Sequence, residues 1–332
     1  MSIDSPSAKS PGSFRLAAIQ AAPVLFDKTA STEKACALIK EAGLHGADVC
    51  AFGETWLPGY PFWIEGGVQD LTWEASAAYI ENAIILGGPE TDALCAAAEK
   101  AGVDVVIGIA EKDPHTQGSV YATALQIGRE GDILGRHRKL KPTHAERIIW
   151  SDGDGAGLRT HARAYGRLSA LNCWEHQMML PGYALAAQGT QIHCALWPGW
   201  EKTPQPAEYC WARQALLSRA FASQAAAYVI CAAGLRRNSD IPEKWKPLGE
   251  WEHSGHSMII DPRGEIIAGP MEGEGILYAD GSLDIVRAAK AACDIAGHYA
   301  RPDVFELYVD NEPRSAAASF FQTDEEEVTE NE

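Results

Sequence analysis

Glu54, Lys139 and Cys173 each lie at the end of a short apolar segment or within two residues of its end. Such segments are typical of buried strands, and α/β folds build their sites from residues at strand ends. A thiolate is a nucleophile, a carboxylate can accept its proton, and an ammonium group can stabilise negative charge that develops during an addition. The three residues together therefore predict covalent catalysis by a cysteine.

Each residue has a second interpretation when its segment is considered alone. Glu54 could be a surface glutamate that follows a turn, and Lys139 could protect an exposed basic edge strand. Cys173 is one of eight cysteines and could be structural like the other seven. It could also form a Cys–His dyad with His176, which follows in the same turn. Spacing alone leaves these alternatives open.

Three sequence blocks occur in the order Glu54-Thr-Trp-Leu-Pro-Gly-Tyr-Pro, His137-Arg-Lys139-Leu-Lys-Pro-Thr-His-Ala-Glu146-Arg and Leu-Asn-Cys173-Trp-Glu-His. Together they resemble the three signature blocks of the nitrilase superfamily. The resemblance extends over most of the chain, from Phe14 to Asp310. The tryptophan directly after the cysteine is similar to true nitrilases rather than to the amidase or carbamoylase branches.

This resemblance implies a role for each residue. Cys173 would be the nucleophile, Glu54 the general base and Lys139 the group that stabilises charge. Glu146 matches a second glutamate, which would position the substrate or relay a proton. The implied reaction converts an organic nitrile to a carboxylic acid and ammonia through a thioimidate and a thioester, with some amide as a side product. The resemblance implies no metal ion and no organic cofactor.

Aromatic residues lie next to the three blocks and could line an apolar pocket for an aryl or arylaliphatic nitrile. The candidate pocket residues are Tyr60, Trp174, Trp197 and His176. The alternative for each of them is a place in the core or in an interface, and His176 would then be a structural neighbour of the cysteine.

Two other functions compete with nitrile hydrolysis. An amidase of the same superfamily would share the glutamate, lysine and cysteine but start from an amide, and Trp174 argues against it. A non-catalytic scaffold would keep the fold only for assembly into oligomers. Such a protein has no use for a strand-end cysteine accompanied by a lysine and two glutamates.

The elements that must position these residues follow an α/β pattern. Strands are predicted over residues 14–23, 48–52, 103–110, 120–127, 131–139, 167–172, 191–197, 227–233, 255–260, 264–268 and 275–279. Helices are predicted over residues 31–44, 73–86, 91–101, 180–188, 207–224 and 283–296. The resemblance implies that they form a four-layer α-β-β-α sandwich of the nitrilase or carbon–nitrogen hydrolase type.

No linker rich in glycine and serine divides the chain, which favours a single domain. We expect a flexible N-terminus over residues 1–13 and one carbon–nitrogen hydrolase domain over residues 14–310. Residues 311–332 form an expected C-terminal extension, whose acidic end is predicted to be disordered.

Composition limits the partners and the compartment. The 332 residues carry a formal net charge of −17, which disfavours binding to nucleic acid or to an anionic membrane. No apolar run has transmembrane length and residues 1–13 lack a signal-peptide core, so we expect a cytoplasmic protein.

No two cysteines form a Cys-x-x-Cys pair, which argues against a zinc knuckle. The resemblance implies a homodimer that extends to a larger homo-oligomer or spiral.

Overall fold

The computed structural model describes residues 12–65, 69–202, 208–249 and 252–314. Most of the expected flexible N-terminus and of the expected acidic tail lies outside the described residues. No helix in the described part of the chain combines the length and the apolar character that crossing a membrane requires.

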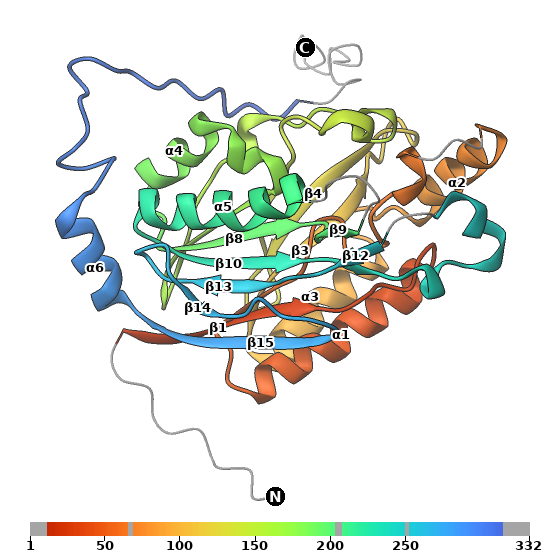
Figure 1. Ribbon diagram of the computed structural model, residues 1–332, viewed down its shortest axis with the longest axis horizontal. Helices are drawn as coiled ribbons and strands as arrows, with labels where there is room; N and C mark the ends of the chain where they lie inside the picture. The colour runs from red at the N-terminus through yellow and green to blue at the C-terminus, as the bar shows by residue number, and fades with distance from the viewer. Residues whose placement is uncertain (1–11, 66–68, 203–207, 250–251, 315–332) are drawn as a thin grey trace, which may run out of the picture.

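Two sheets lie face to face in the middle of the molecule, and helices cover both outer faces (Figure 1). Helices α1 (Lys28–Leu44) and α3 (Pro89–Ala101) cover the first sheet. Helices α4 (Met179–Ala187) and α5 (Glu208–Ala225) cover the second. The four-layer α-β-β-α sandwich expected from the sequence is therefore confirmed.

The first sheet has six strands in the order β15-β1-β2-β3-β4-β5. Neighbouring strands are parallel across β1, β2 and β3 and antiparallel at both sides of this group. The strands are β15 (Gly275–Ser282), β1 (Ser13–Gln20), β2 (Val49–Ala51), β3 (Asp104–Lys112), β4 (Val120–Ile127) and β5 (Ile133–Arg138). Strand β5 forms one edge of this sheet.

The second sheet also has six strands, in the order β14-β13-β10-β8-β7-β6. Its three central strands β7, β8 and β10 are parallel. The strands are β14 (Ile266–Ala268), β13 (Met258–Ile260), β10 (Tyr228–Ala233), β8 (Ile192–Trp197), β7 (Gly166–Asn172) and β6 (His161–Arg163). A small third sheet joins β11 (Leu235–Arg236), β12 (Glu252–Ser254) and β9 (Glu201–Lys202).

Strand β1 shows why the central strands are apolar along their whole length. Ala17 and Ile19 pack in the core beneath α1 and α3. Leu16 and Ala18 point the other way and pack in the core between the two sheets. A strand that is buried on both faces needs apolar side chains at every position rather than at alternate positions.

The predicted helices and strands agree with the structure apart from shifts at their ends and several short elements. The helix expected over residues 73–86 is α2 (Gln69–Asn82), which ends earlier because Ile84 forms a β-bridge with Glu111. The helix expected to reach residue 296 is α6 (Leu283–Ala292). The sequence did not predict β6, β9, β11 and β12, nor the 3-10 helices η1 (Phe62–Glu65), η2 (His144–Ile148), η3 (Gly155–Gly157), η4 (Cys173–Gln177), η5 (Asn238–Asp240) and η6 (Glu243–Leu248).

Candidate active site

The structure brings Glu54, Lys139, Glu146 and Cys173 into one buried cluster. Glu54 follows β2 and Lys139 follows β5, both in the first sheet, whereas Cys173 follows β7 of the second sheet. The sulfur of Cys173 and one carboxylate oxygen from each of the two glutamates lie within 4.8 Å of one another. The Lys139 ammonium donates hydrogen bonds to Glu54 at 2.7 Å and to Glu146 at 2.6 Å. The cluster therefore spans both sheets.

Glu54 is held by close packing of backbone from three segments. Its N–H donates to the carbonyl of Trp197 at the end of β8, which ties the loop after β2 to the second sheet. Strand β3 passes so near that a Cβ at Gly108 would lie 2.2 Å from the carbonyl oxygen of Gly53. Only glycine fits there. The alternative of a surface glutamate is wrong, because Glu54 is 1% exposed.

Lys139 lies directly beyond β5, and its backbone continues the sheet through a hydrogen bond from its N–H to the carbonyl of Ala122. The position of Lys139 at the edge of the sheet agrees with the alternative that it protects an exposed edge strand. Its burial contradicts that alternative. Lys139 is 1% exposed and its ammonium forms ion pairs with two carboxylates. A lysine with this burial and pairing is an internal charge of the cluster.

Glu146 belongs to the 3-10 helix η2, and three donors fix its carboxylate. One oxygen accepts from Lys139 and from the N–H of Thr143 at 2.6 Å. The other accepts from the hydroxyl of Tyr60 at 3.0 Å. Tyr60, predicted as a pocket residue, therefore reaches the cluster through Glu146.

Cys173 begins the 3-10 helix η4 with a φ of 49°, which is in the left-handed region. Residues other than glycine rarely adopt this conformation, and strain of this kind is common at functional sites. The N–H of Trp174 contacts the sulfur and favours its thiolate form. The sharp turn after the strand therefore presents the thiol to the cluster.

Burial and charge decide where the protons of the cluster lie. Burial raises the pKa of Glu54 to about 8, although Lys139 opposes this rise. Burial also raises the pKa of the Cys173 thiol well above its usual value, and the Glu54 charge adds to this effect. Burial alone would lower the pKa of Lys139, but Glu146 and Glu54 hold it well above its usual value. The lysine therefore stays charged, and the thiol needs a neighbouring base in order to ionise.

His176 does not present a nitrogen to the Cys173 thiol. One ring nitrogen donates to the backbone carbonyl of Cys173 at 2.7 Å, and the other lies 2.9 Å from His193. Burial lowers the pKa of His176 to about 4. These contacts leave the ring no free nitrogen for the thiol, so the geometry does not support a Cys–His dyad.

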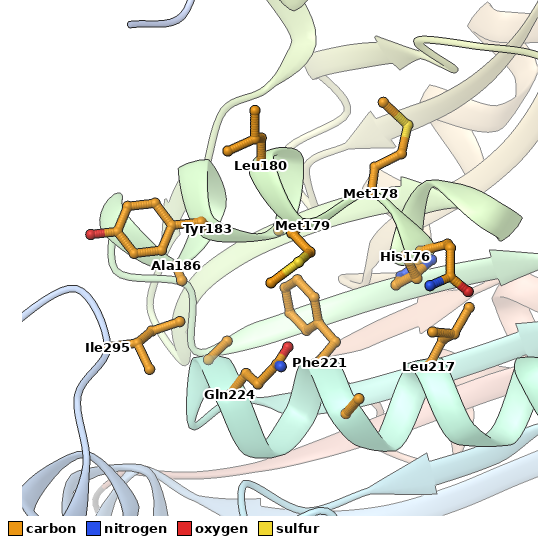
Figure 2. Close-up of a pocket in the computed structure, with 14 residues that line it drawn as sticks. His176, Met178, Met179, Leu180, Tyr183, Ala186, Leu217, Phe221, Gln224 and Ile295 are labelled. Carbon is orange, nitrogen blue, oxygen red and sulfur yellow. The ribbon is translucent and has the colours of Figure 1, made fainter. Parts of the chain in front are cut away.

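The other predicted pocket residues have different surroundings. Trp197 is buried, stacks on His176 at 5.5 Å and donates its indole N–H to Ser218 of α5. His176 lines a groove between α4 and α5, on the helix-covered side of the second sheet (Figure 2). Trp174 is partly exposed, and the guanidinium of Arg213 lies 4.5 Å from the centre of its ring. Of the four candidates, Tyr60 hydrogen-bonds to a side chain of the cluster, whereas His176 bonds to the backbone of Cys173.

Sequence reasoning missed Trp150 and Glu175. The Trp150 ring lies 5.6 Å from the Lys139 ammonium and 5.6 Å from the Tyr60 ring. Glu175 is buried and accepts hydrogen bonds from backbone next to both Lys139 and Cys173. Glu175 lies inside the block that contains the cysteine, so its position next to the nucleophile was the available signal.

Glu54, Glu146 and Cys173 are also close enough together to be considered as ligands of a metal ion. The Lys139 ammonium lies within 2.7 Å of one oxygen from each glutamate. It therefore supplies the positive charge that a metal ion would bring, and a cation at the same oxygens would have to displace it. These residues fit an organic active site better than a metal centre.

Comparison with known proteins identifies the family. The carbon-nitrogen hydrolase family model matches residues 15–291. The chain is 51% identical over 310 residues to Nitrilase 2 from an unknown prokaryotic organism, which covers 91% of this chain and 94% of that protein. It is 36% identical over 320 residues to an aliphatic nitrilase of Rhodococcus rhodochrous, covering 92% of this chain and 81% of that protein. The chain belongs to the carbon-nitrogen hydrolase family, which confirms the resemblance found in the three sequence blocks.

Solved structures give the same architecture. A carbon-nitrogen hydrolase from Helicobacter pylori has a TM-score of 0.71 at 18% identity and covers 89% of this chain and 97% of its own. An amidase from Nesterenkonia sp. has a TM-score of 0.62 at 18% identity, covering 84% of this chain and 94% of its own. At these identities the likeness establishes the fold alone.

Proposed function

We propose that this protein is a nitrilase that hydrolyses an organic nitrile to the carboxylic acid and ammonia. The observation that carries the proposal is the buried cluster in which the Cys173 sulfur lies within 4.8 Å of two carboxylates that the Lys139 ammonium joins. The relatives named Nitrilase 2 and aliphatic nitrilase, at 51% and 36% identity, support the choice of a nitrile. Cys173 is the proposed nucleophile, Glu54 the base and Lys139 the stabilising charge.

The first half of the reaction forms a carbon–sulfur bond. Glu54 accepts the proton of the Cys173 thiol, and the sulfur attacks the nitrile carbon. Negative charge develops on the nitrile nitrogen, and the Lys139 ammonium donates a proton to that nitrogen. Lys139 recovers a proton from Glu54 through the hydrogen bond between them, which restores the Glu54 carboxylate. The product is a neutral thioimidate on Cys173.

The second half uses two water molecules. Glu54, again a carboxylate, takes a proton from the first water as its oxygen adds to the thioimidate carbon, and passes this proton to the nitrogen. The hydroxyl proton of the tetrahedral intermediate follows by the same route, so that ammonia leaves and a thioester remains. A second water adds to the thioester, and release of the thiol gives the carboxylic acid. If the first intermediate expels sulfur instead of ammonia, one water is consumed and the amide is formed.

Glu146 has a positioning and electrostatic role in this proposal. With Glu54 it holds the Lys139 ammonium from two sides, and Tyr60 and the Thr143 N–H fix its own carboxylate. The rings of Tyr60 and Trp150 are the proposed apolar surface for the organic part of the nitrile, because both lie close to the cluster.

The substrate test is a panel of aliphatic nitriles, aryl nitriles, arylacetonitriles and cyanide, with ammonia, acid and amide all quantified. We expect release of ammonia and acid from at least one nitrile, at a rate above that from the matching amide. Faster ammonia release from phenylacetamide than from phenylacetonitrile, with no nitrile turned over, would identify an amidase instead. No turnover of either, together with no selective labelling of Cys173 by iodoacetamide, would indicate a scaffold.

Variants test the assignment of roles. Cys173→Ala is expected to abolish nitrile hydrolysis, and Glu54→Gln to lower kcat by about 10²–10⁴-fold. His176→Asn should keep most of the activity, because its ring bonds to the backbone of Cys173 rather than to the sulfur. An inactive His176→Asn beside an active Glu54→Gln would transfer the role of base to the histidine.

The proposed function includes assembly into a homo-oligomer through the groove between α4 and α5. The groove between α4 and α5 has a volume of about 500 Å³, and Figure 2 shows Met179 and Phe221 on its two walls. Exposed apolar side chains line it, among them Met178, Met179 and Leu180. We propose that a second copy of the chain covers this face and that dimers associate further.

We also propose residues 14–310 as the functional domain and the cytoplasm as its compartment, where free thiols such as Cys173 persist.

A further inference from the structure

Glu175 is a buried carboxylate that accepts hydrogen bonds from three donors in two parts of the chain, His137 and Leu140 in one and Asn172 in the other. One oxygen accepts from the N–H of Leu140 at 2.8 Å, and the other accepts from the N–H of Asn172 at 2.8 Å. A ring nitrogen of His137 lies 3.0 Å from both oxygens. Glu175 and His137 are 1% and 0% exposed, so water does not compete for these bonds.

The two backbone groups that Glu175 holds are next to the proposed nucleophile and the proposed charge stabiliser. Leu140 directly follows Lys139 at the end of β5 in the first sheet. Asn172 directly precedes Cys173 at the end of β7 in the second sheet. One side chain therefore fixes how the end of one sheet lies against the end of the other at the point where chemistry is proposed.

Cys173 needs such support because its backbone has a positive φ of 49°. Glu175 holds the N–H of the preceding residue, and His176 holds the carbonyl of Cys173 itself. A strained conformation persists only where surrounding contacts determine it from more than one side. The hydrogen bonds on both sides of Cys173 meet this requirement.

A local role as a helix cap explains only part of this arrangement. As the third residue of η4, Glu175 would accept from the N–H of Asn172 in an ordinary capping box. Capping does not account for the bonds from Leu140 and His137, which come from the other sheet. Burial alone would raise the pKa of Glu175, but the His137 charge and these donors lower it, so the carboxylate is ionised.

We propose that Glu175, oriented by His137, is a positioning residue that sets the distance between Cys173 and Lys139. The effect on kcat rests on the proposed nitrilase function, whereas the effect on the reactivity of the Cys173 thiol does not. The nearest isosteric change is Glu175→Gln. Its amide replaces one acceptor oxygen by a donor, so one of the two N–H groups, from Leu140 or Asn172, loses its acceptor and must move.

Glu111→Gln is the matched control. Glu111 is also 1% exposed, and it ties β3 to β5 through hydrogen bonds from Arg138 at 2.6 and 3.2 Å. It bonds to no residue of η4 among the described contacts. Both variants remove one buried and multiply bonded carboxylate, so both should lower Tm.

The kinetic experiment compares these two variants with the wild type on the best nitrile of the panel. Glu175→Gln is expected to lower kcat by about 100-fold with little change in KM, since small displacements of reacting groups have effects of this size. Glu111→Gln should retain kcat within about threefold of the wild type, because Glu111 bonds to the side chains of Thr123 and Arg138 rather than to the backbone beside Lys139 or Cys173. Equal losses of kcat in the two variants at equal losses of Tm would overturn the proposal.

Alkylation of Cys173 by iodoacetamide, followed by peptide mass spectrometry, gives a readout without any nitrile. We expect Cys173 to react about tenfold more slowly in Glu175→Gln than in Glu111→Gln, because the thiolate then loses the nearby Lys139 charge. If the wild type hydrolyses no nitrile and the two variants still differ in alkylation rate, the nitrilase proposal is wrong but the positioning role of Glu175 is supported. Equal alkylation rates would remove the positioning role whatever the substrate is.

If Glu175→Gln does not fold, His137 gives a second test from the other side. His137→Gln keeps an N–H that can reach the carboxylate, whereas His137→Leu removes it. We expect His137→Leu to lower kcat and the alkylation rate, and His137→Gln to restore much of both. Wild-type values in His137→Leu would overturn the proposal.

Discussion

Burial acts against ionisation of both groups that must exchange a proton at the cluster. It raises the pKa of the Cys173 thiol and brings that of Glu54 to about 8, while the Lys139 ammonium stabilises both anions. Its raised pKa makes Glu54 a stronger base toward the thiol proton than an exposed glutamate would be.

This shared environment predicts the pH dependence of the reaction. Glu54 acts as a base only when it is a carboxylate, so the rate should rise with pH as this group loses its proton. Because burial raises the pKa of Glu54 to about 8, we expect the acid limb of kcat/KM to lie in the neutral to alkaline range. The limb belongs to the coupled cluster rather than to Glu54 alone.

The measurement is kcat/KM for one neutral nitrile between pH 5 and pH 10, since a neutral substrate adds no ionisation of its own. An acid limb near the ordinary glutamate value would show that Glu54 is not the buried base. Glu111→Gln serves as a control whose limb should coincide with that of the wild type.

At the scale of elements, strand ends place the cluster, and close backbone packing fixes it. The apolar runs made the strands and their order along the chain predictable, because a strand that is buried on both faces has few alternatives. The sequence placed Glu54, Lys139 and Cys173 beside these strands for the same reason. The 3-10 helices η2 and η4 were not predicted, because hydrogen bonds from Tyr60 and His137, which are distant in sequence, help to hold their glutamates.

Gly108 in β3 gives the element-scale prediction about activity. A methyl group there would lie 2.2 Å from the Gly53 carbonyl and 2.4 Å from the Thr55 N–H, so Gly108→Ala must displace the loop that carries Glu54. We expect a loss of kcat of about 100-fold together with a lower Tm. Gly118→Ala is the control, because the nearest atom to its Cβ is 3.9 Å away. Wild-type kcat in Gly108→Ala would show that the loop adjusts without moving Glu54.

The histidine pair between η4 and β8 predicts how stability depends on pH. Burial lowers the pKa of His176 to about 4 and that of His193 well below its usual value. The unfolded chain binds these protons near pH 6.5 and the folded chain does not, so the stabilising contribution is complete above pH 6.5. It is lost progressively as the pH falls from there toward 4.

His193→Gln should therefore lose less stability than the wild type when the pH falls from 7 to 5. Urea unfolding at the two pH values measures the difference, and each variant is compared with itself so that its stability at pH 7 cancels. The same pH effect in both proteins would mean that His193 is not buried in its neutral form.

At the scale of the whole molecule, the site exists only when both sheets are packed together. Lys139 and Glu54 come from the first sheet and Cys173 from the second, and the core between the sheets sets their separation. The apolar runs in the sequence predict the strands of both sheets and the site residues that follow them. The sequence could not predict which side chains would bridge the two sheets, as Glu175 does, because that contact follows from the packing of one sheet on the other.

The charge distribution of the molecule bears on its assembly. The chain has a net charge of −17, so two copies repel each other over most of their surfaces. The described residues that line the α4–α5 groove include no aspartate, glutamate, lysine or arginine. This groove therefore combines exposed apolar side chains with a lining free of charged residues, which is what the core of an interface between copies requires.

Met179 lies on this face, is 82% exposed and lines the groove, so Met179→Glu would place a carboxylate at the proposed contact. We expect this variant to be monomeric at concentrations at which the wild type forms dimers or larger oligomers, as measured by light scattering after size-exclusion chromatography. Leu44→Glu is the matched control, because Leu44 is 75% exposed at the end of α1 on the opposite outer layer. Because η4 connects Cys173 directly to α4, the monomer should also have a lower kcat than the oligomer. An unchanged oligomer in Met179→Glu would place the interface on another face of the sandwich.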